Sequence, residues 1–282
     1  MNLHENTDFG RKVFFLNPSS FLMDNIIPAL FDKEYEIYTI GSYKHAKSVL
    51  KKFPDSICFI CIDSVQDENQ KVDELSPTGW YNFICSFEKD PILSTIFVGI
   101  ISENATKPQQ EFFQLNTQIP AGFIRLPCDT PQLIEIFAGI LEINGAKGRR
   151  QYIRTNCSSD PNVQVRLPPE YQMSVKDISF AGLACSGSSE TSDHFKVNTL
   201  IRDFDLSIHG KKYKCSGAVL MVSGREDITD LVIMFTKGSS LPFRTAIKDY
   251  IQQSMQNSIK TITESSPADT EDYSVQDAET VE

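Results

Sequence analysis

The densest group of basic side chains lies in residues 145–156, GAKGRRQYIRTN. Lys147, Arg149, Arg150 and Arg154 fall within eight residues with no acid among them, although the 282-residue chain has a formal net charge of −10. A guanidinium group can donate two parallel hydrogen bonds to phosphate oxygens or to guanine O6 and N7, and it can stack on a purine. The overall acidity argues against a general nucleic-acid binder. We therefore expect the basic cluster to serve a local purpose.

A second group of polar residues follows 23 positions after Arg154 in the stretch DISFAG. Asp177, Ser179 and Gly182 fit the pattern D-x-S-x-x-G, and Arg150 with Arg154 fits R-x-x-x-R. A carboxylate accepts hydrogen bonds from groups such as guanine N1–H and N2–H, and a hydroxyl adds a further contact. A glycine lets another group approach the backbone closely and permits a tight turn. Each motif alone also fits a solvated linker or an ordinary turn between strands.

The first half of the chain alternates between short apolar runs and segments with helical spacing. The runs indicate strands because they are short, apolar and bounded by breakers, and their nearly continuous hydrophobicity favours burial on both faces. Five β/α units in a row predict a doubly wound parallel sheet. We expect strands at 12–18, 35–41, 56–63, 95–102 and 121–127, and helices at 19–32, 43–53, 78–89, 107–117 and 130–144.

The second half, from Val163, contains many short strands and few helices, which predicts an antiparallel barrel or sandwich. Gly210 marks a hairpin turn, because glycine supplies the positive φ that such turns need. A helix is expected at 242–262, with an apolar stripe that packs on the barrel. The fold class is therefore α/β followed by β, and the arginine cluster lies between the two parts.

The two motifs together, in this order and ahead of a small β-barrel, resemble the signature of PilZ domains, which are bacterial receptors for the messenger cyclic di-GMP (c-di-GMP). The resemblance covers about residues 146–262 and implies a six-stranded antiparallel barrel with a C-terminal helix. It also implies a signal receptor with no catalytic activity and no cofactor, in which the nucleotide is the ligand.

The resemblance assigns a role to each residue of the two motifs. Arg150 and Arg154 would clamp the ligand from the segment that precedes the barrel, and Arg149 would contact a phosphate. Asp177 and Ser179 would meet a guanine from the barrel, and Gly182 would allow close approach. Binding would order the 146–156 segment and change the angle between the domains.

Residues 11–145 resemble a response-regulator receiver domain that has lost its chemistry. Asp63, at the end of the third strand, matches the phosphoacceptor of that family and is a vestigial candidate here. Asn17 and Pro18 fill the places of the acidic pair that holds Mg²⁺, so the developing phosphoryl charge would lack compensation.

The fifth strand of the receiver-like domain has also lost a conserved basic residue of that family. Leu126 stands where the family has a lysine, and the neighbouring Arg125 is expected to face the other side of the strand. A degenerate receiver is expected to keep a surface for a protein partner, by analogy of fold.

Two alternative functions stay open from the sequence. The first is a response regulator that is driven by phosphorylation of Asp63. The second is an interaction protein with a PilZ fold that ignores the nucleotide. The downstream target, the number of nucleotides bound and the oligomeric state are likewise open.

The remaining expectations concern the ends of the chain, its location and its thiols. Residues 1–10 form an N-terminal extension, and residues 263–282, with seven acids and no base, are expected to be a disordered acidic tail. We expect a cytoplasmic protein without membrane insertion or DNA or RNA binding. Cys58 and Cys61 are expected in one buried strand, pointing to opposite faces, so they cannot share a metal.

Overall fold

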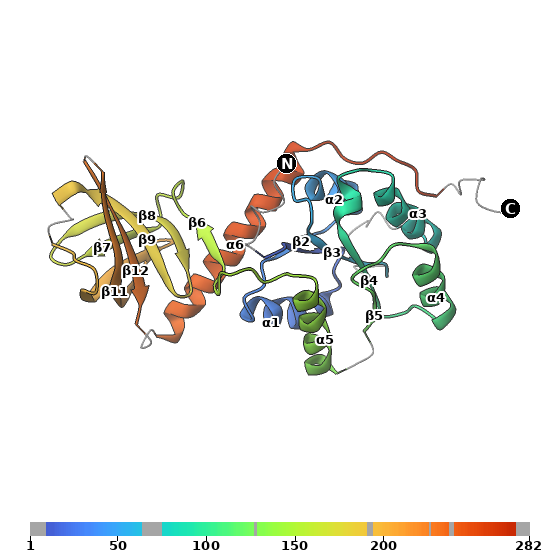
Figure 1. Ribbon diagram of the computed structural model, residues 1–282, viewed down its shortest axis with the longest axis horizontal. Coiled ribbons are helices and arrows are strands. Elements are labelled where there is room, and N and C mark those ends of the chain that lie inside the picture. The colour runs from blue at the N-terminus through green and yellow to red at the C-terminus, as the bar shows by residue number, and fades with distance from the viewer. Residues whose placement is uncertain are drawn as a thin grey trace. The chain divides into compact units, whose positions relative to one another are not determined.

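The computed structural model describes residues 10–63, 75–126, 129–190, 194–225, 227–236 and 240–274. The chain forms two compact units (Figure 1). The first comprises Met1–Gln151 with Gln256–Glu282, and the second comprises Tyr152–Met255. Residues 1–9 of the expected N-terminal extension lie outside the described residues.

The first unit contains a five-stranded parallel sheet with the order β2-β1-β3-β4-β5. This order places a topological switch point between β1 and β3, the position at which open α/β sheets commonly bind ligands. The doubly wound parallel sheet predicted from the sequence is thereby confirmed. Its strands are β1 (Val13–Leu16), β2 (Ile37–Ile40), β3 (Ile57–Cys61), β4 (Phe97–Ser102) and β5 (Phe123–Arg125).

Helices cover both faces of this sheet, as the continuous apolar strands require. Every residue of β1 and β3 is buried. In Figure 1, α1 and α5 lie on one face and α2 and α3 on the other. The helical elements are η1 (Leu22–Ile26), α1 (Ile27–Asp32), α2 (Tyr43–Leu50), α3 (Pro77–Glu88), η2 (Leu93–Thr95), α4 (Lys107–Asn116) and α5 (Thr130–Ile143).

Several of these helices begin at residues that are suited to their position. The side chains of Ser42, Ser76 and Thr106 accept hydrogen bonds from the first turns of α2, α3 and α4. Proline follows directly in the first turns of α3 and α4, where its missing N–H has no intrahelical partner in any case. The local sequence therefore fixes where these helices begin.

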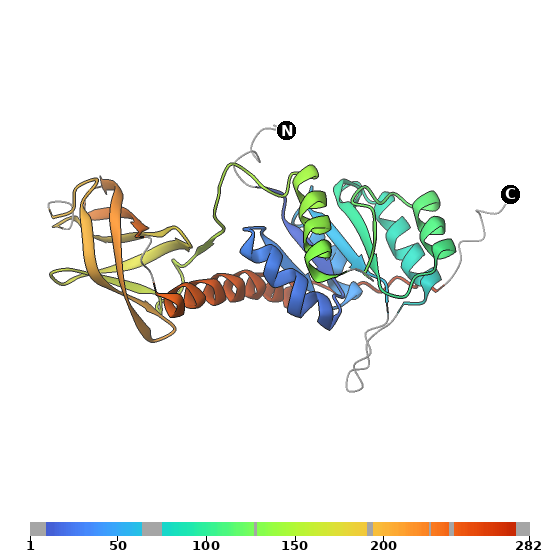
Figure 2. The ribbon, with the colours of Figure 1, turned by 90° about the horizontal axis from the view of Figure 1, so that it is seen from below.

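The second unit is an antiparallel β-barrel. Six strands close in the order β7-β8-β9-β12-β11-β10, and β10 pairs back onto β7. A seventh strand, β6, adds to the free edge of the second half of β8. The strands are β6 (Arg154–Asn156), β7 (Gln164–Leu167), β8 (Tyr171–Ser179), β9 (Gly182–Ser188), β10 (Leu200–Ile208), β11 (Lys211–Arg225) and β12 (Ile228–Phe235). The predicted six-stranded barrel is confirmed, and Figure 2 shows it from a second direction.

The barrel follows from local patterns in its strands. Buried and more exposed residues alternate along β7, β8 and β12, so one face of each strand fills the interior. His209 and Gly210, at φ 48° and 76°, join β10 to β11. The hairpin predicted at Gly210 is confirmed, because both residues take the positive φ of a two-residue turn.

Helix α6 (Leu241–Ser265) begins on the barrel. The Phe243 ring lies 5.1 Å from that of Phe235 and 5.9 Å from that of Tyr213, between ring centroids. Ile247 and Ile251 are buried at the same helical spacing. The first part of the apolar stripe therefore packs on the barrel, as the sequence predicts. Ile259, further along the stripe, is buried in the part of the helix that groups with the first unit.

The C-terminal segment differs from the expected disordered tail. Helix α6 continues to Ser265, and residues 256–274 group with the first unit rather than with the barrel. Residues 269–273 contact α2 and α3, where the Tyr273 side chain is 3% exposed. Composition missed this because one buried aromatic ring and a few specific ion pairs hold the segment in place. Residues 275–282 lie outside the described residues.

Candidate functional site

Strand β6 brings the second arginine of R-x-x-x-R next to the D-x-S-x-x-G motif. Its residues pair antiparallel with the end of β8, so that Arg154 lies opposite Ser179 and Asn156 lies opposite Asp177. Since side chains alternate along strands, these four residues share one face of the strand pair. The two inward positions, Thr155 and Ile178, are buried. Arg154 thus meets the D-x-S-x-x-G motif, which begins 23 positions later in the sequence, on the barrel.

Arg154 and Asp177 form an ion pair on this face. The guanidinium nitrogen lies 3.7 Å from the Asp177 carboxylate, and the two side chains remain 47% and 36% exposed. An exposed pair of this kind contributes at most about 1 kcal/mol to stability. Both groups can therefore turn to a ligand with little loss of stability.

Ser179 is turned toward the backbone. Its side chain is buried, and its hydroxyl donates a hydrogen bond to the Gly182 carbonyl oxygen at 3.2 Å. This contact spans the two-residue connection between β8 and β9 and stabilises the end of the hairpin. A contact from Ser179 to a ligand stays a prediction, and it would use the remaining lone pairs of the hydroxyl or a rotated hydroxyl.

Gly182 is required by the neighbouring strand. A Cβ at this position would lie 2.1 Å from the Ile233 carbonyl oxygen and 3.0 Å from the Met234 Cα. Gly182 is not among the residues of positive φ, so its backbone conformation does not by itself require glycine. The glycine instead lets β9 and β12 pair at close range.

The basic residues ahead of the barrel fall into two groups. Arg149 and Arg150 are exposed and belong to the first unit, whereas Arg154 belongs to the second. The ammonium group of Lys147 lies 4.7 Å from the centroid of the Tyr35 ring, a cation–π contact within the first unit. Lys147 therefore has a structural contact of its own within the first unit, and Arg154 forms the ion pair with Asp177 within the second.

Asn156 is the residue of this site that sequence reasoning missed. It shares the outer face with Arg154 and lies opposite Asp177. Its Oδ1 accepts a hydrogen bond from the Ser158 backbone N–H at 2.8 Å, which leaves its amide N–H groups directed elsewhere. No apolar alternation marks residues 154–156 as a strand, so only their pairing with β8 reveals this position.

Asp63 lies at the switch point of the first unit, where its carboxylate is engaged by hydrogen bonds. One oxygen accepts from the Ser102 hydroxyl at 2.7 Å and the other from the Glu103 backbone N–H at 2.5 Å. The side-chain amide of Asn17 donates to the carbonyl oxygens of Cys61 and Asp63 at 3.3 and 3.4 Å. These groups hold the ends of β1, β3 and β4 together.

The fifth strand agrees with the loss of receiver chemistry. Leu126 is buried in the core between the sheet and α5, and Arg125 is exposed. The position that the receiver resemblance gives to lysine is therefore taken by a buried apolar side chain. Residues 127 and 128, which follow, lie outside the described residues.

The thiols of Cys58 and Cys61 are structural. Burial raises the pKa of Cys58 to about 12 and that of Cys61 to about 11, so both stay protonated near neutral pH. Within the described ranges, no three His, Cys, Asp or Glu side chains group closely enough to hold a metal ion. Over the same ranges, no helix is both long and apolar enough to cross a membrane.

Comparisons with known proteins place both parts among solved structures. No protein-family model matches the chain, and no curated protein does. The chain is similar to the PilZ domain with c-di-GMP of YcgR from Escherichia coli, with 12% identity over 40% of this chain and 96% of that one (TM-score 0.35). It is similar to the MrkH–c-di-GMP complex of K. pneumonia, with 16% identity over 40% of this chain (TM-score 0.36). It is also similar to a response regulator from Desulfuromonas acetoxidans, with 17% identity over 47% of this chain and 98% of that one (TM-score 0.34).

The chain spans 55% of the length of that MrkH chain.

Proposed function

We propose that this protein is a c-di-GMP receptor that binds the nucleotide at the rim of its barrel and catalyses no reaction. The observation that carries the proposal is the exposed pair of Arg154 and Asp177, which β6 and β8 hold on one face. The order and spacing of the two motifs, which resemble those of PilZ domains, support it. The proposed ligand contacts are Arg149, Arg150, Arg154, Asp177, Ser179 and Gly182.

The two charged groups at the rim complement different parts of a guanine nucleotide. The Arg154 guanidinium can donate two hydrogen bonds to guanine O6 and N7 or pair with a phosphate. The Asp177 carboxylate can accept hydrogen bonds from N1–H and N2–H of a guanine, which adenine does not present in that arrangement. Binding would replace the weak ion pair between these side chains with stronger, charge-assisted bonds to the ligand.

The arginines ahead of the barrel extend the proposed site. Arg150 would contact the ligand together with Arg154, and Arg149 would contact a phosphate. Because Arg149 and Arg150 precede β6 in the chain, holding them on the ligand would change the arrangement of the two units. Fixing these side chains lowers the net affinity, and several charge-assisted bonds offset this cost.

Titration calorimetry with c-di-GMP tests the proposal, with GTP and cyclic di-AMP as controls. We expect binding to c-di-GMP alone, with a stoichiometry that distinguishes one bound nucleotide from a stacked pair. Arg154→Ala and Arg150→Ala should each weaken binding by roughly 2–4 kcal/mol, or about 30- to 700-fold, because each leaves ligand groups unpaired.

Arg166→Ala is the matched control for these variants. Arg166 is a half-exposed arginine of the same barrel that forms a 3.2 Å ion pair with Glu170, so its removal also breaks one surface pair. We expect its affinity for c-di-GMP to equal that of the wild type. A change below about fivefold in both Arg154→Ala and Arg150→Ala would refute the assignment, and an absence of binding would leave the nucleotide-independent interaction protein as the alternative.

A further inference from the structure

The segment 269–273, DTEDY, fills a surface between α2 and α3 of the first unit. The Tyr273 ring lies 6.1 Å from the Tyr43 ring and 5.3 Å from the Phe83 ring, edge to face in both cases. Trp80 packs behind these rings, at 6.1 Å from Tyr43 and 5.7 Å from Phe83. Tyr273 thus completes an aromatic cluster whose other members come from the two helices.

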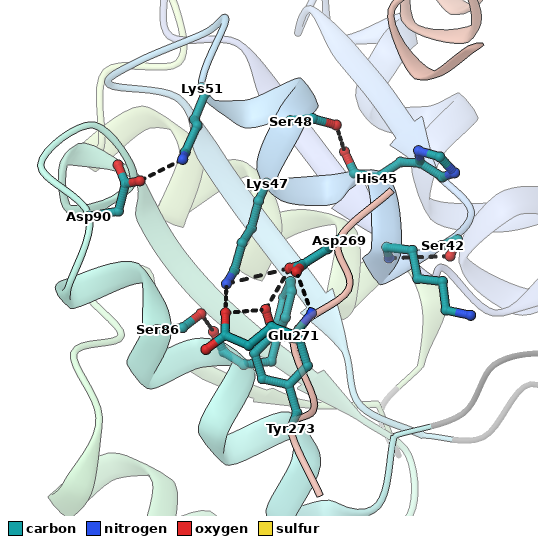
Figure 3. Close-up of polar contacts among 12 residues, drawn as sticks. Ser42, His45, Lys47, Ser48, Lys51, Ser86, Asp90, Asp269, Glu271 and Tyr273 are labelled. Carbon is teal, nitrogen blue, oxygen red and sulfur yellow. Dashed lines mark hydrogen bonds and ion pairs between the residues drawn. The ribbon is translucent and has the colours of Figure 1, made fainter. Parts of the chain in front are cut away.

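Lys47 of α2 forms the polar part of the same surface. Its ammonium group lies 2.7 Å from the Glu271 carboxylate and 3.4 Å from that of Asp269, and its side chain is only 15% exposed. It also lies 4.9 Å from the centroid of the Tyr273 ring. A lysine this well covered requires opposite charge close by, and residues 269–273 supply both carboxylates (Figure 3).

The spacing of the three contacting residues sets a recognition pattern. Asp269, Glu271 and Tyr273 alternate along the segment, so in an extended chain they lie on one side. The Tyr273 hydroxyl oxygen lies 2.5 Å from the Asp269 carboxylate and 3.0 Å from that of Glu271. Its single proton can be donated to either acid, and the hydroxyl thereby keeps both acids close to Lys47. Two acids, four and two residues before a tyrosine, therefore match this surface.

Backbone contacts fix the segment at both ends. The Asp269 backbone N–H donates to the Lys44 carbonyl at 2.6 Å, and the Asn82 amide donates to the Tyr273 carbonyl at 2.8 Å. The segment adds no strand to the sheet and follows the end of α6, so it can detach by local unfolding while the sheet stays intact.

We propose that the α2–α3 face is a docking site for an extended acidic segment of a partner protein that carries this acid-x-acid-x-tyrosine pattern, and that residues 269–273 occupy the site as an intramolecular competitor. The tether gives the chain's own segment a high effective concentration. A partner therefore gains access only when it outcompetes the segment or when the segment is displaced. The inference depends on the first unit alone and is independent of nucleotide binding.

The experiment uses the full-length chain and a labelled peptide of residues 266–276, SPADTEDYSVQ, with binding followed by fluorescence anisotropy. In the wild type the peptide must compete with the tethered segment. In Tyr273→Ala the tethered segment is weakened, so the peptide should bind at least tenfold more tightly than to the wild type. The double variant with Lys47→Met and Tyr273→Ala should lose this gain in peptide affinity, because the ammonium group that pairs with the two acids of the peptide is absent.

Two controls separate recognition from general effects. Asp272→Asn in the full chain changes the same charge within the segment, but the hydrogen bonds of the Asp272 side chain within the described ranges go to Ser274 and not to Lys47, so this variant should bind the peptide as the wild type does. A peptide with alanine in place of its tyrosine should bind Tyr273→Ala at least tenfold more weakly than the parent peptide. If Tyr273→Ala does not fold, as judged by circular dichroism, Asp269→Asn provides a second variant in which the tethered segment is weakened.

The proposal is overturned if the peptide fails to bind the folded variants with a weakened segment, Tyr273→Ala and Asp269→Asn. It is also overturned if the peptide binds these variants and the wild type with equal affinity. Calorimetry with c-di-GMP on the same variants is a separate readout, because no residue of the rim site is changed. A failure of peptide docking and a failure of nucleotide binding are therefore distinguishable.

Discussion

Single residues of the barrel are constrained by atoms that are far away in the sequence. The hydrogen at the Cα of Gly182 faces the Ile233 carbonyl oxygen, and the space is too small for a methyl group. The glycine of D-x-S-x-x-G is thus needed for strand pairing whether or not a ligand binds, and the motif combines structural and binding demands.

Gly182→Ala should destabilise the barrel. The added Cβ would lie 2.1 Å from the Ile233 carbonyl, so β9 and β12 must move apart. We expect a loss of about 1–3 kcal/mol, the usual cost of inserting a methyl group into a packed site. Native-state hydrogen exchange of the β9 and β12 amides measures it. Gly224→Ala, on β11 with nothing within 4 Å of its added Cβ, is the control and should change stability by less than about 1 kcal/mol; equal effects of both substitutions would contradict the prediction.

At the scale of elements, side chains join segments that the backbone leaves unpaired. Asp90 precedes η2, where its Oδ1 accepts from the Ile92 and Leu93 backbone N–H groups at 2.9 and 3.1 Å. Its other oxygen lies 2.6 Å from the ammonium group of Lys51, the residue that follows α2. One carboxylate thus connects the end of α2 to the start of η2.

This arrangement predicts a pH dependence. The Lys51 hydrogen bond, followed by that from the Leu93 backbone, lowers the pKa of Asp90 to about 2. Since the pKa of an unfolded aspartate is about 3.9, the contribution of Asp90 to stability is present above pH ~4 and is lost as the pH falls toward 2. Between these values Asp90→Asn should lose less stability than the wild type, as measured by denaturation of the first unit through its single tryptophan, Trp80. An equal loss of stability in the wild type and in Asp90→Asn over this pH range would contradict the prediction.

The edge of the parallel sheet shows the same use of side chains. Strand β2 pairs only with β1, and its outer edge meets Gln256 of α6. The Gln256 amide accepts from the Thr39 backbone N–H at 3.1 Å and donates to the Thr39 carbonyl at 2.8 Å. The helix thereby satisfies backbone groups that an exposed edge strand would leave open to another chain.

Gln256→Glu should destabilise the first unit by about 1–2 kcal/mol, because glutamate keeps an acceptor but loses the donor to the Thr39 carbonyl. Urea denaturation followed by Trp80 fluorescence measures the loss. Gln253→Glu makes the same change at an exposed position of α6, and its stability should stay within about 0.5 kcal/mol of the wild type. If the two variants unfold at the same urea concentration, Gln256 does not protect the edge.

At the scale of the whole molecule, the proposed receptor must convert binding into a change of domain arrangement. A ligand can do so only if it binds one arrangement better than the others. The residues proposed to bind c-di-GMP include Arg149 and Arg150 in the first unit and Arg154 in the second. Their joint engagement would favour one arrangement of the two units.

We therefore expect saturating c-di-GMP to change the small-angle X-ray scattering curve of the full-length protein. Cyclic di-AMP should leave the curve unchanged. Arg154→Ala, at the same nucleotide concentration, should scatter as the free wild type does, because its affinity is reduced. Identical curves for the free and fully bound wild type would show that binding does not alter the arrangement of the units.

Much of the architecture could be predicted from the sequence. The runs at 12–18 and 56–63 are apolar throughout, and only burial on both faces of a sheet makes such strands stable. Gly210 marked the β10–β11 hairpin, and the stripe that begins at Phe243 marked the helix on the barrel. The motif spacing also predicts the residues of the ligand site, and their role in binding stays a prediction for all six.

Periodicity and turn chemistry alone determined which segments are strands and helices, because burial and backbone conformation act on neighbouring residues. Only the tertiary structure decided that Arg154–Asn156 joins β8, that Ile233 demands a glycine at position 182, and that Tyr273 packs on α2 and α3. Each of these depends on a contact between groups distant in the chain. Such contacts form where shape and charge are complementary in three dimensions, and the sequence of neighbouring residues does not reveal that complementarity.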